Sequence, residues 1–275
     1  MDPDTPDAAA QPVAAHAAPL LDESPRRVVS LVPSLTESLF DLDLGARLIA
    51  VTDACVHPAG ALDGLARVGA PDAPDCDQII ALAPDLVFVS DEVNPPSVAD
   101  ELLAAGLTVW QTGPRSVFEA LNLLWDIMNA FDHPVMVPRV QAIERAYDAT
   151  LAASRATPPV TVFAPLNRDP WRCPARESFT YDLLRVCGGK SLFPDGEPVS
   201  PDDLVAAQPD AILLPEGEGS PFGADDANRL AALDIPAARN GRIHLSDGTL
   251  LTWPGTRIAY ALRDLPALLA PAMME

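Results

Sequence analysis

The sequence predicts an α/β protein with two Rossmann-like lobes, each built on a parallel sheet, joined by a single long backbone helix. The helix is expected over residues 138–155, where apolar side chains recur at spacings of three and four and therefore share one helical face. Pro138 fits the first turn, where the missing N–H of a proline is tolerated, and the prolines at 158 and 159 end the helix. The 275 residues leave room for a lobe of about domain size on each side.

Two pairs of segments on either side of this helix resemble each other. The first pair is residues 34–45 and 178–189. Each segment begins with a Ser that is followed two positions later by a Thr, and each ends with a Gly at the same distance from its Ser. In the second pair, residues 77–89 and 202–214, an Asp leads through a Pro-Asp step into an apolar stretch. Chance likeness between ordinary αβ units is the alternative, but two matches in the same order favour two lobes of similar fold.

These patterns divide the chain into four parts. Residues 1–25, rich in Asp, Ala and Pro, are predicted to be a disordered tail, followed by an N-terminal α/β lobe over 26–132, the connecting helix over 133–157 and a C-terminal α/β lobe over 158–275. The tail has neither the basic start nor the apolar core of a secretory signal, which predicts a cytoplasmic protein as the sequence stands. An extracytoplasmic location is the alternative if the start or a leader is missing.

The composition argues against several classes of partner. Asp plus Glu outnumber Lys plus Arg by 39 to 18, a formal net charge of −21, which disfavours binding to nucleic acid or to an anionic membrane surface. No apolar run approaches the ~20 residues of a membrane span. The cysteines at 55, 76, 173 and 187 show no CxxC spacing, so we interpret them as buried or semi-buried thiols.

The motifs that accompany catalysis are missing from the sequence. It has no Walker-type phosphate loop, no GxGxxG after a strand and no GxSxG elbow, and its four histidines lack metalloenzyme spacing. The sequence therefore favours a binding protein with no catalytic residue, no metal site and no cofactor. An enzyme that uses a cleft between the lobes would have only fold analogy to support it.

Polar side chains that follow the predicted strands are candidates for ligand contact, because such loops line the crevice at the carboxyl ends of parallel strands. Ser34 and Glu37 are expected to form a capping box on the helix after the first strand, so capping competes with ligand contact as the role of Ser34. For Cys55 and His57, a loop thiol and a surface imidazole are favoured over a metal site. Trp171 is either an anchor for lobe packing or a ligand platform, with near-equal weight.

Several stretches of the sequence together resemble one protein family. They are RRVVSLVPSLTESLFDLDLGARLIAVTDACVHP at 26–58, DQIIALAPDLVFVS at 77–90, RDPW at 168–171, YDLLRVCGGKSLF at 181–193 and DGTLLTWPGTR at 247–257. Over residues 27–269 the chain is similar to the cobalamin-binding type of the helical-backbone metal receptor superfamily, the substrate-binding proteins of ABC importers. The resemblance implies the class III periplasmic-binding-protein architecture, in which a stiff helix connects two lobes and one ligand lies between them.

The resemblance also assigns residues to roles. Carried over by motif, the residues that it places in the ligand cleft are Pro33, Ser34, Asp53, Cys55, Glu92, Arg115, Asn167, Arg168, Trp171, Trp253 and Arg257. Asp77 and Asp202 stand where family members carry the acidic residue, usually Glu, that docks the permease; the alternative is an Asp favoured by the helix dipole in a first turn. The chain departs from the family pattern at Asn167, where an aromatic is usual, and at Pro254, where Tyr is usual.

The function that the resemblance implies is that of a non-enzymatic solute-binding protein. It would hold cobalamin or a related metal chelate, such as another corrinoid, a heme or a ferric siderophore, for delivery to an ABC importer. Its expected partners are the small-molecule ligand and an ABC permease, with no nucleic acid and no membrane insertion, and the protein is expected to be a monomer. The alternative is a cytoplasmic binding or partner module of the same fold that serves no transporter.

Overall fold

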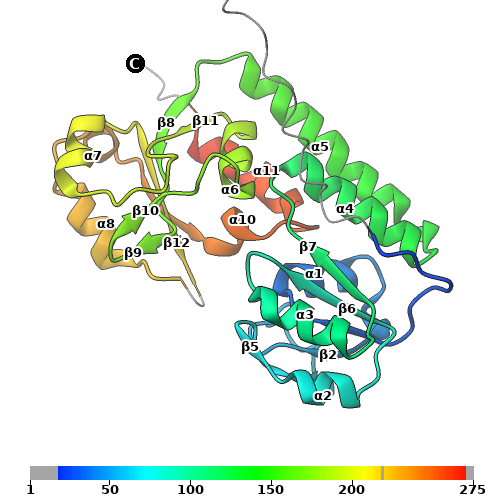
Figure 1. Ribbon diagram of the computed structural model, residues 1–275. Coiled ribbons are helices and arrows are strands. Elements are labelled where there is room, and N and C mark those ends of the chain that lie inside the picture. Colours follow the sequence, from blue (N-terminus) through cyan, green and yellow to red (C-terminus); the bar gives the residue numbers. More distant parts are fainter. Residues whose placement is uncertain (1–17, 218–219, 271–275) are drawn as a thin grey trace, which may run out of the picture.

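The computed structural model describes residues 18–217 and 220–270, so most of the predicted N-terminal tail lies outside the described residues. The chain forms two lobes, each built around a sheet (Figure 1). The N-terminal sheet has the strand order β3-β2-β1-β6-β7 and the C-terminal sheet the order β11-β8-β12-β13. Every neighbouring pair in both sheets is parallel, which confirms the predicted fold class.

The N-terminal lobe alternates strands with helices. Its strands are β1 (Val28–Ser30), β2 (Leu48–Val51), β3 (Ala66–Arg67), β6 (Leu86–Ser90) and β7 (Val109–Thr112), with a small hairpin of β4 (Gly69–Ala70) and β5 (Ala73–Pro74). Its helices are α1 (Pro33–Asp41), η1 (Gly45–Arg47), α2 (Cys76–Ala81) and α3 (Pro96–Ala104). The chain continues with α4 (Val117–Ala130), η2 (Pro134–Met136) and α5 (Val137–Arg155), and Figure 1 shows α4 and α5 along the upper right side of the molecule.

The C-terminal lobe repeats this alternation. Its strands are β8 (Val160–Phe163), β11 (Gly189–Ser191), β12 (Ala211–Glu216) and β13 (Ile243–Asp247), with a hairpin of β9 (Asn167–Arg168) and β10 (Trp171–Arg172). Its helices are α6 (Phe179–Val186), α7 (Pro201–Ala207), α8 (Ala224–Ala231), α9 (Pro236–Arg239), α10 (Gly248–Thr252) and α11 (Ile258–Leu268). The predicted strand that follows the connecting helix is therefore the central strand β8.

Consecutive side chains of the central strands pack in different hydrophobic clusters, because side chains alternate between the two faces of a sheet. Val28 of β1 packs in a cluster with α1 and α4, whereas Val29 packs in a cluster with α2 and α3. Val162 and Phe163 of β8 divide in the same way between the two faces of the second sheet. Strands β1 and β6 are buried along their whole length, as expected of parallel strands that are covered on both faces.

The second pair of repeated segments has the same structure in both lobes. Helices α2 and α7 each lead through the Pro-Asp step into the next strand, β6 or β12. In the first lobe the Asp85 carboxylate accepts the backbone N–H groups of Arg26 and Arg27 at 2.9 Å, just before β1. In the second, the Asp210 carboxylate accepts the N–H of Thr161 in β8 at 3.0 Å. The Asp of the repeat thus joins each incoming strand to the central strand of its sheet.

The first pair of repeated segments differs between the lobes, and the predicted capping box at Ser34 is wrong. Helix α1 begins at Pro33, two residues earlier than a cap at Ser34 would place it, because a proline is well suited to the first helical position. Ser34 therefore lies inside the helix, and the N-cap residue Val32 provides no side-chain cap. In the second lobe Ser178 does cap α6, accepting the N–H of Tyr181 at 3.3 Å.

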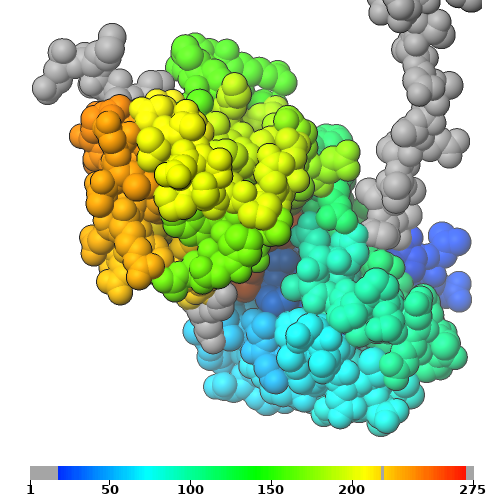
Figure 2. All heavy atoms as spheres, turned by 60° about the vertical axis from the view of Figure 1, so that its left-hand side comes forward, coloured from blue at the N-terminus to red at the C-terminus, as the bar shows by residue number. Residues whose placement is uncertain are grey.

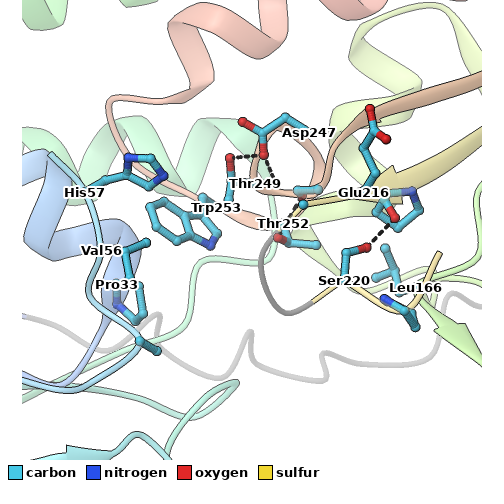
Figure 3. A pocket seen from close by; sticks show the side chains of 15 residues that line it. Pro33, Val56, His57, Leu166, Glu216, Ser220, Asp247, Thr249, Thr252 and Trp253 are labelled. Carbon is cyan, nitrogen blue, oxygen red and sulfur yellow. Dashed lines mark hydrogen bonds between the residues drawn. The ribbon is translucent and has the colours of Figure 1, made fainter. Parts of the chain in front are cut away.

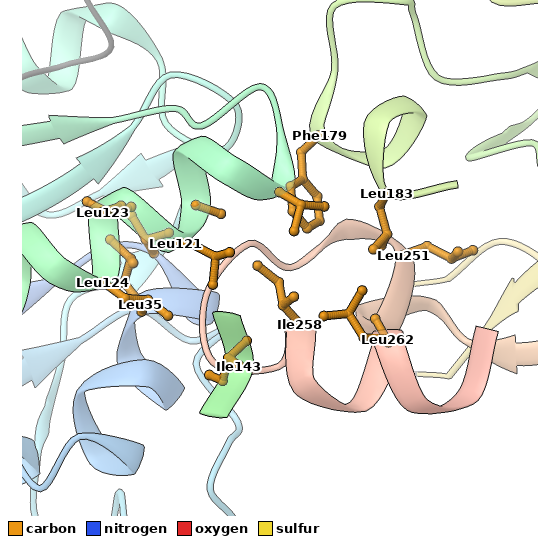
Figure 4. Packing of buried hydrophobic residues seen from close by; sticks show 14 of the residues in the cluster. Leu35, Leu121, Leu123, Leu124, Ile143, Phe179, Leu183, Leu251, Ile258 and Leu262 are labelled. Carbon is orange, nitrogen blue, oxygen red and sulfur yellow. The ribbon is translucent and has the colours of Figure 1, made fainter. Parts of the chain in front are cut away.

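The predicted long helix is α5, and its apolar side joins the two lobes. Val140 and Ile143 are buried, and Tyr147 and Leu151 are half-buried against the same core. Helix α4 lies beside α5, and both contact α6 of the second lobe (Figure 1). One hydrophobic cluster runs from α1 of the first lobe through α4 and α5 to α6, α10 and α11 (Figure 4). The lobes therefore share this cluster, and each lobe also has a cluster of its own on the other face of its sheet.

The four cysteines are buried and unpaired, and burial raises the pKa of each thiol. The pKa of Cys76 is about 11, against an ordinary value of 9.0, so about 100-fold fewer Cys76 thiolates exist at pH 8. We expect Ellman's reagent to react slowly with the native protein, Cys76 first because it is the most exposed at 8%. All four thiols should react at once in denaturant. A fast reaction at another cysteine of the native chain would contradict this.

Within residues 18–217 and 220–270, no helix is both long enough and apolar enough to cross a membrane. The same residues contain no group of three or more His, Cys, Asp or Glu side chains that could hold a metal ion.

Candidate ligand-binding site

A cavity of about 570 Å³ opens between the two lobes (Figure 2). We call it the main cavity. The residues that line it are Pro33, Ala54, Val56, His57, Leu166, Pro215, Glu216, Gly217, Ser220, Pro221, Asp247, Gly248, Thr249, Thr252 and Trp253. Its volume lies in the usual range for small-molecule sites. Figure 3 shows Pro33, Val56 and His57 on one side and Leu166, Glu216 and Ser220 on the other.

Five parallel strands position these walls. Pro33 follows β1, the segment 54–57 follows β2, and Leu166 follows β8. The C-terminal end of β12 and the residues after it supply a further wall, and Asp247 ends β13. All of them lie at or beyond the carboxyl ends of their strands, where ligands bind in open α/β sheets. The carboxyl ends of the strands in both sheets thus border the main cavity.

Trp253 is the largest side chain in the main cavity. Its ring meets the His57 ring edge-on, with centroids 5.8 Å apart and an interplanar angle of 77° (Figure 3). The guanidinium carbon of Arg257 lies 5.2 Å from the centroid of the same indole, at cation–π distance. The Trp253 ring therefore contacts an imidazole and a guanidinium, and part of its apolar surface lines the cavity.

A smaller cavity of about 210 Å³ shares Pro33, Thr252 and Trp253 with the main cavity. We call it the side cavity. The residues that line it are Val32, Pro33, Ser34, Leu35, Ser90, Glu92, Val93, Thr112, Pro114, Leu123, Thr252, Trp253 and Pro254. Glu92 is its one charged lining residue. Desolvation raises the pKa of the Glu92 carboxyl, and the nearby Arg115 guanidinium, 3.1 Å away, opposes that rise.

The segment after Trp253 docks on α1 of the other lobe. The N–H of Thr256 donates to Ser38 Oγ at 3.1 Å, and its hydroxyl donates to Asp41 Oδ2 at 2.7 Å. Arg257 donates to both oxygens of Glu37, at 2.7 and 2.6 Å. The side chains of this ion pair are only 11% and 10% exposed. The hydrogen bonds of segment 254–257 therefore link the second lobe to the first, next to the side cavity that Pro254 lines.

The structure brings four of the sequence-predicted ligand residues to the cavities. Pro33 and Trp253 line both, and Ser34 and Glu92 line the side cavity. The predicted residues that line neither are Asp53, Cys55, Arg115, Asn167, Arg168, Trp171 and Arg257.

Several of these residues have other partners. The Cys55 thiol lies beneath its loop, 3.2 and 3.3 Å from the hydroxyls of Thr36 and Thr52, while its neighbours Ala54 and Val56 line the cavity. Arg168 pairs with Asp226 at 3.0 Å. Of the two roles weighed for Trp171, the contacts match lobe packing, because its ring lies 5.7 Å from that of Phe163 within the core of the second lobe.

Sequence reasoning assigned no role in binding to most residues that line the main cavity, among them Val56, His57, Leu166, Glu216, Asp247 and Thr252. All but Thr252 end or follow parallel strands, so strand position was the signal that could have found them. The main cavity has two carboxylates, Glu216 and Asp247, and no Arg or Lys among its lining residues. Its walls are otherwise mostly apolar, so the main cavity has no group that would attract a strongly negative ligand.

Asp77 and Asp202 occupy equivalent exposed positions in the first turns of α2 and α7. Figure 1 shows these two helices on the outer sides of the two lobes, away from α10 and the cleft. Asp75 and Ser200 cap the two helices, so neither Asp77 nor Asp202 is needed as a cap.

A family model described as periplasmic binding protein matches residues 28–249, which contain both sheets and the residues of both cavities up to Thr249. The chain belongs to the periplasmic binding protein family. Similar curated proteins include the vitamin B12-binding protein of Vibrio cholerae serotype O1, 27% identical over 199 residues, which are 69% of this chain and 70% of that protein. The vitamin B12-binding protein of Yersinia pestis is 25% identical over 197 residues, with 70% of each chain covered.

Solved structures of this family have the same fold. The periplasmic heme-binding protein RhuT from Roseiflexus sp. RS-1, in its apo form, superposes with a TM-score of 0.76 at 26% identity, covering 88% of this chain and 97% of its own. The periplasmic vitamin B12-binding protein BtuF of Vibrio cholerae also has a TM-score of 0.76, at 22% identity, covering 91% and 99%. The predicted class III architecture is thereby confirmed.

Proposed function

We propose that the protein is a non-enzymatic solute-binding protein that holds cobalamin or a related metal chelate between its lobes, for delivery to an ABC importer. The observation that carries the proposal is the main cavity, in which the carboxyl ends of both sheets and the ring of Trp253 enclose one largely apolar space. Similarity to vitamin B12-binding and heme-binding proteins supports a large chelate as the ligand. An importer's receptor works outside the membrane, so the proposal includes an extracytoplasmic location.

Equilibrium dialysis against cyanocobalamin, cobinamide, heme and a ferric siderophore tests the proposal. Visible absorbance should show one of these compounds retained at one molecule per chain. Retention of none at high micromolar concentration would overturn the proposed function. Fractionation of the native cells tests the location separately, because a cytoplasmic protein could not serve an importer as its receptor.

Replacing Trp253 by alanine is expected to weaken ligand binding by roughly 10–100-fold, about 1.4–2.8 kcal/mol, because an aromatic anchor in a binding site carries much of the affinity. Ligand quenching of tryptophan fluorescence should fall with it. Trp125→Phe is the matched control, since Trp125 lies on α4 and donates to Glu144 of α5 at 2.6 Å. Equal ligand affinities in the wild type and the Trp253→Ala variant would show that Trp253 does not contribute to ligand binding.

A further inference from the structure

The side cavity has a donor wall at the N-terminus of α1. Pro33 occupies the first position, so the N–H groups of Ser34 and Leu35 have no intrahelical acceptor. The helix has no side-chain cap, and both residues line the side cavity. The positive end of the helix dipole strengthens the attraction between these N–H groups and an oxygen atom of a ligand.

The Ser34 hydroxyl belongs to the same wall. Ser34 is only 6% exposed, and its Oγ has no hydrogen-bond partner among the residues that the structure describes. The Ser34 hydroxyl is not sealed off from solvent, so it can bond to water or to a ligand in the side cavity. An oxygen atom of a ligand in this cavity would therefore meet a hydroxyl donor that no protein group uses.

A further lining residue of the side cavity supplies an acceptor, the Glu92 carboxylate. Arg115 donates to Glu92 Oε1 at 3.1 Å from outside the cavity and gives its other terminal nitrogen to Asp91 at 2.6 Å. The neighbouring hydroxyls of Thr112 and Thr252 donate to backbone carbonyls, at 3.1 and 3.0 Å. Glu92 is thus the strong acceptor of the side cavity, and the N-terminus of α1 supplies donors in the same cavity.

We propose that the side cavity is a carboxamide subsite for the edge of the bound chelate. The oxygen of a primary amide would accept from the α1 N–H groups and the Ser34 hydroxyl, and its NH₂ group would donate to Glu92. A carboxylate at the same place would have its oxygens against Glu92, where like charges repel. The subsite therefore selects chelates with amide edges over chelates with carboxylate edges. This inference rests on the proposed function and specifies the chemistry of its ligand.

Two corrins of the same ring system test the subsite. Dicyanocobinamide carries primary amides at the ring edge, and dicyanocobyrinic acid carries carboxylates in their place. In dialysis at pH 7.5 and 150 mM salt, we expect the wild type to bind the amide form at least 10-fold more tightly. Glu92→Gln should reduce this preference roughly tenfold, mainly by improving binding of the carboxylate form, because a glutamine amide can also donate. Ser34→Ala should weaken binding of the amide form roughly 3–10-fold.

Asp63→Asn is the matched control. Asp63 is an exposed carboxylate between β2 and β3 of the same lobe that lines neither cavity, so the substitution removes the same charge and should leave the preference unchanged. An equal change in both variants would show a general charge effect and overturn the subsite. An unchanged preference in Glu92→Gln, with normal thermal unfolding and tight corrin binding, would also overturn it and leave the proposed function intact. Failure of both corrins to bind the wild type would refute the subsite, and only the failure of heme and the ferric siderophore as well would refute the proposed function.

Discussion

Replacing Arg257 by methionine is expected to lower the free energy of unfolding by about 3 kcal/mol. Arg257 and Glu37 form a two-pronged ion pair between the lobes at 2.6–2.7 Å, and both side chains are largely buried. Without the guanidinium, the Glu37 carboxylate stays buried without its partner, which costs more than the lost attraction. Urea unfolding of wild type and variant measures the difference.

The substitution also separates two roles for Arg257. Arg257 lines neither cavity, so a folded Arg257→Met protein should keep its ligand affinity within a few-fold. The double variant with Glu37→Gln should lose less stability than the two single variants added together, because the residues are directly coupled. Arg263→Met, at an exposed pair with Asp264, should leave stability unchanged. Normal unfolding with lost binding in Arg257→Met would instead identify a ligand contact.

Replacing Gly255 by alanine is expected to cost about 2–4 kcal/mol of stability. The φ of Gly255 is +140°, which side-chain-bearing residues rarely adopt. A Cβ there would overlap the hydroxyl of Ser38 and approach the Ser34 carbonyl oxygen to 3.3 Å. Ser38 would have to turn away, losing its bonds to Ser34 O and to the N–H of Thr256. Thermal and urea unfolding are the measurements.

Gly106→Ala is the control for this clash. Gly106 also has a positive φ, +82°, but no atom lies near the Cβ that alanine would add, so it reports backbone strain alone. Adding Ser38→Ala to Gly255→Ala should recover part of the stability, since it removes the overlapping hydroxyl. If Gly255→Ala were no worse than Gly106→Ala, the close approach of segment 254–257 to α1 would be disproved.

Local patterns were sufficient for much of this fold. The spacing of apolar residues predicted α5, and the Pro-Asp repeats identified equivalent units, because each depends on residues close together in the sequence. The site depended on contacts that no local pattern contains. Glu37 was expected to cap its own helix, yet it pairs with Arg257, 220 residues away. Trp171 and Trp253 both stand next to Pro in the sequence, but only the packing of the lobes places Trp253 in a cavity.

The continuous core through α4, α5, α6 and α11 determines how the cleft can work. A hinge between two lobes needs a short connection with few side chains packed across it. Here many buried apolar side chains pack between the two lobes (Figure 4). Opening the lobes widely would expose this surface to water, at a cost that grows with the apolar area uncovered. We therefore expect the two lobes to move little relative to each other, so that the width of the cleft between them limits the size of the ligands that it admits.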